Sequence, residues 1–141
     1  MSDVLYEATA TAWGGREGRA ATEDGRVDVQ LSIPPGMGGA GGGGTNPEQL
    51  FATGYAAGFH SALKLVAAQQ KVDVTDSAVS VTVALVGSLT TGIDLTARIE
   101  AELPGVDPDR ARQLLEAAHQ VCPYSRATRG NIVSEVSLAE G

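Results

Sequence analysis

Hydrophobic residues recur along this chain with two periods, which divide it into predicted strands and predicted helices. Alternation at period two indicates half-buried strands, and spacings of three and four indicate helical faces. The first pattern predicts strands in segments 4–12, 16–22, 27–33, 79–85, 93–99 and 131–138. The second predicts a long helix over 47–68 and another that begins at Pro108. The order is βββ, α, ββ, α, β.

Turn and cap residues support these boundaries. Gly14-Gly15 permits a tight turn between the first two strands, and Asn46-Pro47-Glu48 is a typical helix start with a capping residue followed by proline. Strand runs separated by single helices, without regular βα alternation, favour an α+β fold with helices on an antiparallel sheet. A length of 141 residues predicts one domain over 1–141.

Two segments differ from ordinary connecting or surface elements. Segment 36–44 is mostly glycine but lies between two patterned elements that are too short to be domains, which favours a functional or clamping loop over a linker. The helix 47–68 is apolar almost all round, which predicts a buried central helix. We expect the sheet of a monomer to leave part of this helix uncovered, so a homodimer that buries two such helices is the expected assembly.

Charge and composition exclude several function classes. The net charge of -7 disfavours binding to nucleic acid and to anionic membranes. No stretch reaches the roughly 20 apolar residues of a membrane span, and the N-terminus lacks a signal-peptide pattern. These features predict a cytoplasmic protein. Cys122 is the single cysteine, so no disulfide forms within the chain.

Few side chains outside the core could carry chemistry. Cys122 follows His119 at a spacing that allows the imidazole to activate the thiol, although a lone cysteine is more often a small buried hydrophobe. A metal site would require His60 to converge with both, and we expect none. Arg16 after the Gly14-Gly15 turn and Glu48 in the first helical turn could form a bidentate ion pair.

Several strings together resemble the organic hydroperoxide resistance (Ohr) family of the OsmC-like superfamily. They are GGREG at 14–18, the glycine-rich loop, TNPEQLFATGYAAGFHSAL at 45–63 and VCPYSRATRGNI at 121–132. The resemblance runs over essentially the whole chain. It implies an OsmC-like α+β fold in which antiparallel sheets wrap around long central helices in an intertwined homodimer. It also implies thiol-dependent reduction of organic hydroperoxides in response to oxidative stress, with no bound cofactor and with dihydrolipoamide or a lipoylated protein as reductant.

The resemblance also implies roles for particular residues. Arg16 and Glu48 match the pair that lowers the pKa of the peroxidatic thiolate and orients the peroxide, and Cys122 matches the resolving cysteine. The peroxidatic cysteine is expected in a string like AACF, and here that string reads AAGF, so Gly58 stands at its position. Because glycine has no nucleophile, we expect peroxide reduction by the family route to be impaired. Loss of the thiol is also expected to leave a small cavity.

Two alternatives to a peroxidase stay open. The first is a non-redox relative that binds an apolar small molecule in a pocket enlarged at Gly58. The second is an enzyme of a biosynthetic pathway in which Arg16 stabilises developing negative charge and Glu48 acts as acid or base.

Overall fold

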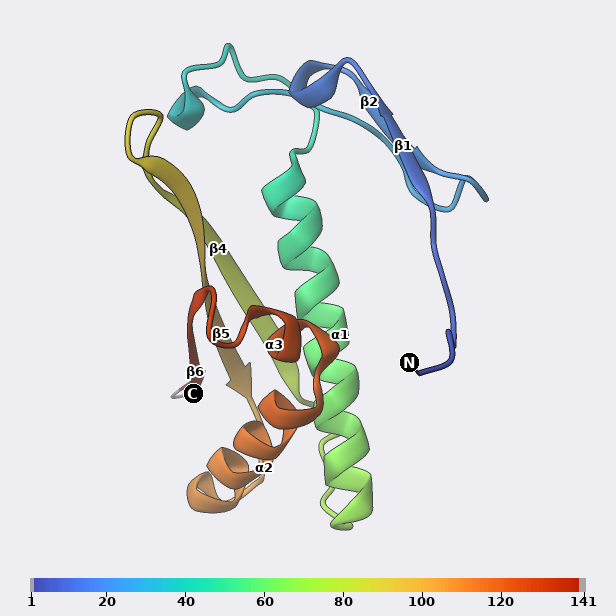
Figure 1. Cartoon of the computed structure of the whole chain (residues 1–141). Helices are drawn as coiled ribbons and strands as arrows, with labels where there is room; N and C mark the ends of the chain where they lie inside the picture. The colour runs from blue at the N-terminus through green and yellow to red at the C-terminus, as the bar shows by residue number, and fades with distance from the viewer. Residues whose placement is uncertain (1, 140–141) are drawn as a thin grey trace. The chain divides into compact units, whose positions relative to one another are not determined.

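The computed structural model describes residues 2–139, and their contacts form two units, one up to Leu50 and one from Phe51 onward. The sequence predicts a single domain over 1–141. The boundary between the units falls near the start of the long helix α1, Pro47–Gln69, which therefore continues from one unit into the other (Figure 1). The predicted helix over 47–68 is confirmed almost to the residue.

The first unit contains a small antiparallel sheet in the order β1-β2-β3. Its strands are β1 (Ala10–Trp13), β2 (Arg19–Thr22) and β3 (Asp28–Gln30). The prediction that the first strand starts at Val4 is wrong, because Val4 and Leu5 are exposed and the strand begins only where β2 provides hydrogen-bonding partners. The turn between β1 and β2 contains the short 3-10 helix η1, Gly15–Glu17.

The glycine-rich loop folds back on the chain that leads into it. It starts with a second 3-10 helix, η2, Pro35–Met37, and the Gly41 amide then donates to the Ile33 carbonyl oxygen at 2.9 Å. A side chain on Gly39 would collide with that carbonyl group, so only glycine allows this close approach. The segment is therefore a folded loop rather than an extended linker.

The second unit contains a three-stranded sheet in the order β4-β5-β6. The strands β4, Ala78–Ser88, and β5, Gly92–Glu102, form the predicted long antiparallel hairpin. The helices α2, Pro108–Val121, and α3, Pro123–Thr128, lead to β6, Val133–Leu138. β6 pairs in parallel with β5, which corrects the expectation of a purely antiparallel sheet. A helical crossover returns the chain to the end of the sheet where β5 began, and this makes a parallel pair possible.

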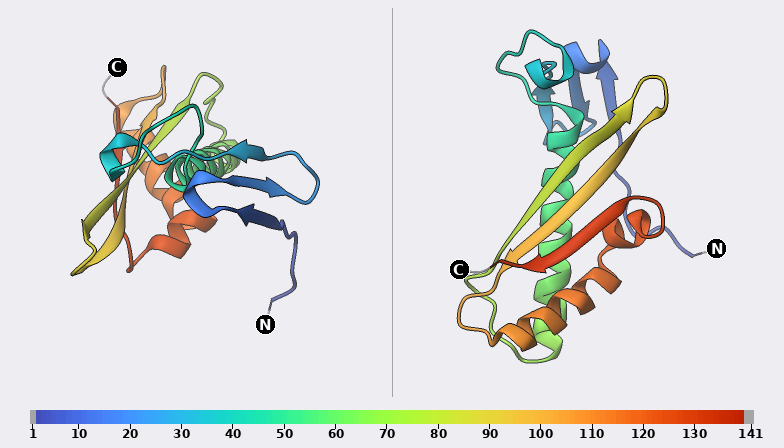
Figure 2. Two further views of the ribbon diagram at one scale, coloured as in Figure 1. Left: turned by 90° about the horizontal axis from the view of Figure 1, so that it is seen from above. Right: turned by 90° about the vertical axis from the view of Figure 1, so that its left-hand side faces the viewer.

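The core of the second unit lies between the sheet and the helices. α1 and α2 lie on the same face of the β4-β5-β6 sheet (Figure 2). The largest fully buried side chains are Tyr55, Phe59, Leu63, Ile99, Leu114, Cys122 and Ser125. α1 buries the face that carries Tyr55, Phe59 and Leu63, whereas Leu65 on the same helix is 54% exposed in the single chain. No helix within residues 2–139 is long and apolar enough to cross a bilayer.

Candidate functional site

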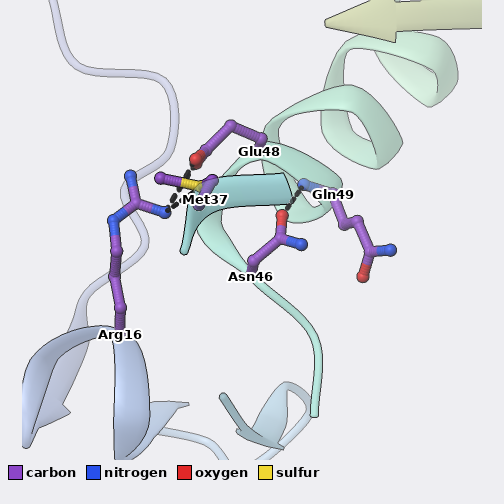
Figure 3. Close-up of polar contacts among 5 residues, drawn as sticks. All are labelled: Arg16, Met37, Asn46, Glu48 and Gln49. Carbon is purple, nitrogen blue, oxygen red and sulfur yellow. Dashed lines mark hydrogen bonds and ion pairs between the residues drawn. The ribbon is translucent and has the colours of Figure 1, made fainter. Parts of the chain in front are cut away.

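The Arg16–Glu48 ion pair lies within the first unit. Arg16 Nη1 donates to Glu48 Oε1 at 2.7 Å and to Oε2 at 3.2 Å (Figure 3). The predicted pairing is therefore observed, but the predicted fork of two nitrogens is not, because Nη1 alone serves both carboxylate oxygens. The side chains are 38% and 16% exposed, so solvent and small molecules can reach the guanidinium.

The turn at η1 positions Arg16, and the capped start of α1 positions Glu48. Gly14 adopts a φ of 78° before η1, a conformation that favours glycine, and the following turn presents Arg16. Asn46 Oδ1 accepts a hydrogen bond from the Gln49 amide at 2.8 Å and so caps α1 (Figure 3). Glu48 lies in the first turn of this helix, where the positive end of the helix dipole favours a carboxylate.

The thioether of Met37 lies next to the same guanidinium. Arg16 Nη1 approaches Met37 Sδ at 3.9 Å from the side of the glycine-rich loop (Figure 3). This contact was not predicted from the sequence, because Met37 reaches Arg16 only through the folding of the loop. The one signal available was a single large side chain in an otherwise glycine-rich segment.

In the second unit, the ring of Tyr124 occupies the space beside Gly58. A Cβ atom on residue 58 would lie 2.5 Å from Tyr124 Cε2 and 2.6 Å from Cδ2, far inside van der Waals contact. The expectation of a cavity at Gly58 is therefore wrong, since an aromatic ring stands where a side chain would begin. The same observation removes the enlarged pocket on which the small-molecule alternative depended.

Cys122 lies in the core at the junction of α2 and α3. Its side chain is fully buried, and its amide donates to the Ala118 carbonyl oxygen at 2.8 Å. The proposed activation by His119 finds no support, because His119 Nδ1 instead lies 2.8 Å from Ser125 Oγ. Burial lowers the pKa of His119 below its usual value, the Arg129 charge lowers it further, and Glu116 opposes them. A neutral imidazole near pH 7 supplies no positive charge to stabilise a thiolate.

A buried chain of hydroxyl groups extends from His119. Ser125 Oγ lies 2.9 Å from the Tyr55 hydroxyl, which in turn lies 3.5 Å from Thr128 Oγ1. Helical spacing placed Tyr55 on the apolar helix face and did not predict these partners, because both Ser125 and Thr128 belong to the unpredicted helix α3. These hydrogen bonds satisfy polar groups that burial would otherwise destabilise.

His60 has a structural partner. Its Nε2 lies 2.9 Å from Ser77 Oγ, in the connection that follows α1. Within residues 2–139 no group of three or more histidine, cysteine, aspartate or glutamate side chains could hold a metal ion.

Comparisons with known proteins assign this chain to a family. A sequence model described as "OsmC-like protein" matches residues 39–137. The organic hydroperoxide resistance protein of Xanthomonas axonopodis pv. citri is 50% identical over 96% of each chain. A Legionella pneumophila structure described as an organic hydroperoxide resistance protein superposes with a TM-score of 0.92 at 41% identity, covering 98% of this chain and all of that one.

The chain belongs to the Ohr family. OhrB of Bacillus subtilis, a further member with a crystal structure, superposes with a TM-score of 0.88 at 39% identity, covering 96% of this chain and 100% of that one. The similarity covers nearly the whole chain, which confirms the expected OsmC-like α+β fold and an Ohr-like role in oxidative stress. The roles of Arg16, Glu48, Gly58 and Cys122 stay predictions.

Proposed function

We propose that this Ohr-family protein takes part in defence against organic hydroperoxides through its Arg16–Glu48 pair, and that the thiol route of the family is impaired in it. The relatives named as organic hydroperoxide resistance proteins support the first part. Gly58, which matches the position of the peroxidatic cysteine in the AACF-like string, supports the second.

Reduction of a hydroperoxide requires a nucleophile that attacks the terminal oxygen while an alkoxide leaves. A guanidinium stabilises the developing negative charge by donating hydrogen bonds, and a carboxylate partner keeps the guanidinium in place. Arg16 has donors beyond Nη1 for this task, because its hydrogen bonds to Glu48 and Met37 all use that nitrogen. Glycine supplies no nucleophile at position 58.

The observation that carries the impairment is the position of Tyr124. Its ring stands within 2.6 Å of the place where a side chain on residue 58 would begin. The local packing therefore fits glycine and would have to change to accept cysteine. Cys122, the expected resolving cysteine, is fully buried and cannot replace the missing nucleophile without a rearrangement of the core.

We also infer that the working assembly is a homodimer reduced by dihydrolipoamide or a lipoylated protein, as the family resemblance implies, and that it acts in the cytoplasm. The exposed face of α1 supports the dimer, since Leu65 is 54% exposed on a helix that is apolar almost all round.

Steady-state reduction of cumene hydroperoxide with dihydrolipoamide tests the proposal. The wild-type chain should show little turnover, Gly58→Cys should gain some, and Gly58→Cys combined with Tyr124→Ala should gain more because the ring no longer blocks the thiol. Gly54→Cys is the matched control, since it adds a thiol to the same helix at a site with open space.

Rapid turnover by the wild-type chain would contradict the proposed impairment. Failure of both Gly58→Cys variants, with the fold retained, would contradict the assignment of position 58. Arg16→Ala in the most active variant should abolish the gain, and an unchanged rate would exclude Arg16 from the reaction.

A further inference from the structure

The Arg16 guanidinium contacts a sulfur atom in this protein. Arg16 Nη1 lies 3.9 Å from Met37 Sδ and 2.7 Å from Glu48 Oε1, so one nitrogen joins the thioether and the carboxylate (Figure 3). All three residues belong to the unit up to Leu50. Met37 is 42% exposed, so a peroxide can reach its sulfur from solvent.

The chain offers few other sulfur atoms that a hydroperoxide could oxidise. The chain has one cysteine and two methionines, Met1 and Met37. Cys122 is fully buried in the core of the other unit. Met37 is therefore the accessible sulfur within residues 2–139, and it lies beside the arginine expected to bind hydroperoxides.

We propose that Met37 is a peroxide-reactive site, which an organic hydroperoxide bound at Arg16 oxidises to methionine sulfoxide. The inference rests on the proposed role of Arg16 in hydroperoxide binding. It assigns a reacting sulfur that differs from the cysteine pair expected of the family. The reaction consumes Met37 once, and further cycles would need a methionine sulfoxide reductase.

The step balances without any additional reactant. A lone pair of Met37 Sδ attacks the terminal oxygen of the hydroperoxide, an S–O bond forms and the O–O bond breaks. The leaving alkoxide takes the proton of the terminal hydroxyl and departs as the alcohol. The sulfur loses two electrons and the peroxide gains them, so the products are one sulfoxide and one alcohol.

Arg16 can promote this step through the donors that do not bond to Glu48 or Met37. A thioether is a weak hydrogen-bond acceptor with two lone pairs, so the contact with Nη1 leaves one pair for attack. The guanidinium also carries N–H groups on Nε and Nη2, which do not bond to Glu48 or Met37, and these can stabilise the developing alkoxide. Glu48 holds the guanidinium beside the sulfur.

The product should change the contacts of Arg16. A sulfoxide oxygen is a much stronger acceptor than a thioether sulfur, so oxidised Met37 should compete with Glu48 for Nη1. Because Met37 ends η2 in the glycine-rich loop, oxidation would also alter the contact between this loop and η1.

Timed oxidation of the full-length protein with cumene hydroperoxide tests the inference. Peptide mass mapping would locate the added oxygen atom, and a synthetic peptide of residues 33–39 provides the rate of an unassisted methionine. Met37 in the protein should oxidise roughly 10- to 100-fold faster than in the peptide, as expected for hydrogen bonds to a developing charge. Arg16→Ala should reduce the rate to that of the peptide, whereas Met37→Leu should remove the modification.

Equal rates in protein and peptide, or a rate unaffected by Arg16→Ala, would overturn the inference. Arg16-dependent turnover by a Gly58→Cys variant, together with unassisted oxidation of Met37, would overturn it while the proposed function stands. If the Gly58→Cys variants show no turnover and Met37 is oxidised no faster than in the peptide, both the inference and the proposed function are overturned. Assisted oxidation of Met37 without turnover by any cysteine variant would support the inference and contradict the assignment of position 58.

Discussion

The ring of Tyr124 fills the space that a side chain on Gly58 would enter, with Tyr124 Cε2 only 2.5 Å from the position of the missing Cβ. Tyr124 follows α2 in the chain, and Gly58 lies in the middle of α1. This packing explains how a glycine is accommodated inside a long helix, where it otherwise costs about 0.5–1 kcal/mol relative to alanine. The close approach of the ring replaces contacts that a side chain would make.

Alanine substitutions at two glycines of α1 should have opposite effects on stability. Gly54→Ala should raise the free energy of unfolding by about 0.5–1 kcal/mol, because it improves helix propensity at a site with open space. Gly58→Ala should lower it by about 1–3 kcal/mol, because the methyl group collides with Tyr124. Denaturant unfolding measures both changes. An equal gain at the two sites would mean that the ring of Tyr124 moves away freely.

Removal of the Tyr55 hydroxyl should destabilise the second unit. Tyr55→Phe leaves the ring in the core but removes a buried hydrogen bond to Ser125 of 2.9 Å, which should cost about 1–2 kcal/mol. Tyr124→Phe is the matched control, because Tyr124 is 41% exposed and the change should stay within about 0.5 kcal/mol. Equal effects of the two substitutions would show that the hydroxyl chain contributes nothing to stability.

Loss of the cap at α1 should weaken the start of the helix that carries Glu48. Asn46→Ala removes the acceptor of the Gln49 amide and should lower the free energy of unfolding by about 1 kcal/mol, whereas Asn46→Asp should retain it. Thermal or denaturant unfolding gives the difference. If Asn46→Ala is as stable as the wild type, water or another group satisfies that amide.

Acid should destabilise the fold through His119. Burial lowers the pKa of its imidazole in the folded state below the unfolded value of 6.5, with Arg129 adding to the effect and Glu116 opposing it. Just below pH 6.5 the unfolded chain therefore binds more protons than the folded chain. The stability that the neutral imidazole of His119 contributes is complete above about pH 6.5, and it falls as the pH decreases toward the folded-state pKa.

The measurement is unfolding between about pH 5 and pH 7, combined with an NMR titration of the imidazole. His119→Gln keeps a hydrogen-bonding group toward Ser125 and should reduce the pH dependence. A folded-state pKa at or above 6.5 would contradict the assignment of His119 as neutral.

The expected homodimer predicts an effect of charge on the exposed face of α1. Leu65→Glu places a carboxylate where the single chain exposes an apolar side chain, so it should leave the fold intact and favour the monomer. Light scattering of both proteins gives the assembly state, and Lys64→Glu on the same helix turn serves as control for charge alone. A dimer unchanged by Leu65→Glu would place the interface elsewhere.

Local pattern by itself determined most of the secondary structure. Alternation between Val79 and Leu85 predicted β4, and helical spacing with the Asn46-Pro47 start predicted α1, because these signals depend on neighbours within a few residues. The family strings identified Arg16 and Glu48 as partners although they lie far apart in the chain, and the structure brings them to 2.7 Å.

Tertiary structure decided which distant groups meet. The parallel pairing of β6 with β5, the filling of the space at Gly58 by Tyr124 and the approach of Met37 to Arg16 all depend on how separate segments pack. The hydrophobic periodicity of the sequence cannot predict such contacts, because they depend on shape and hydrogen bonding between residues that lie far apart in the chain. Residue types thus indicated the local elements and the family, whereas three-dimensional packing decided which sulfur lies beside Arg16.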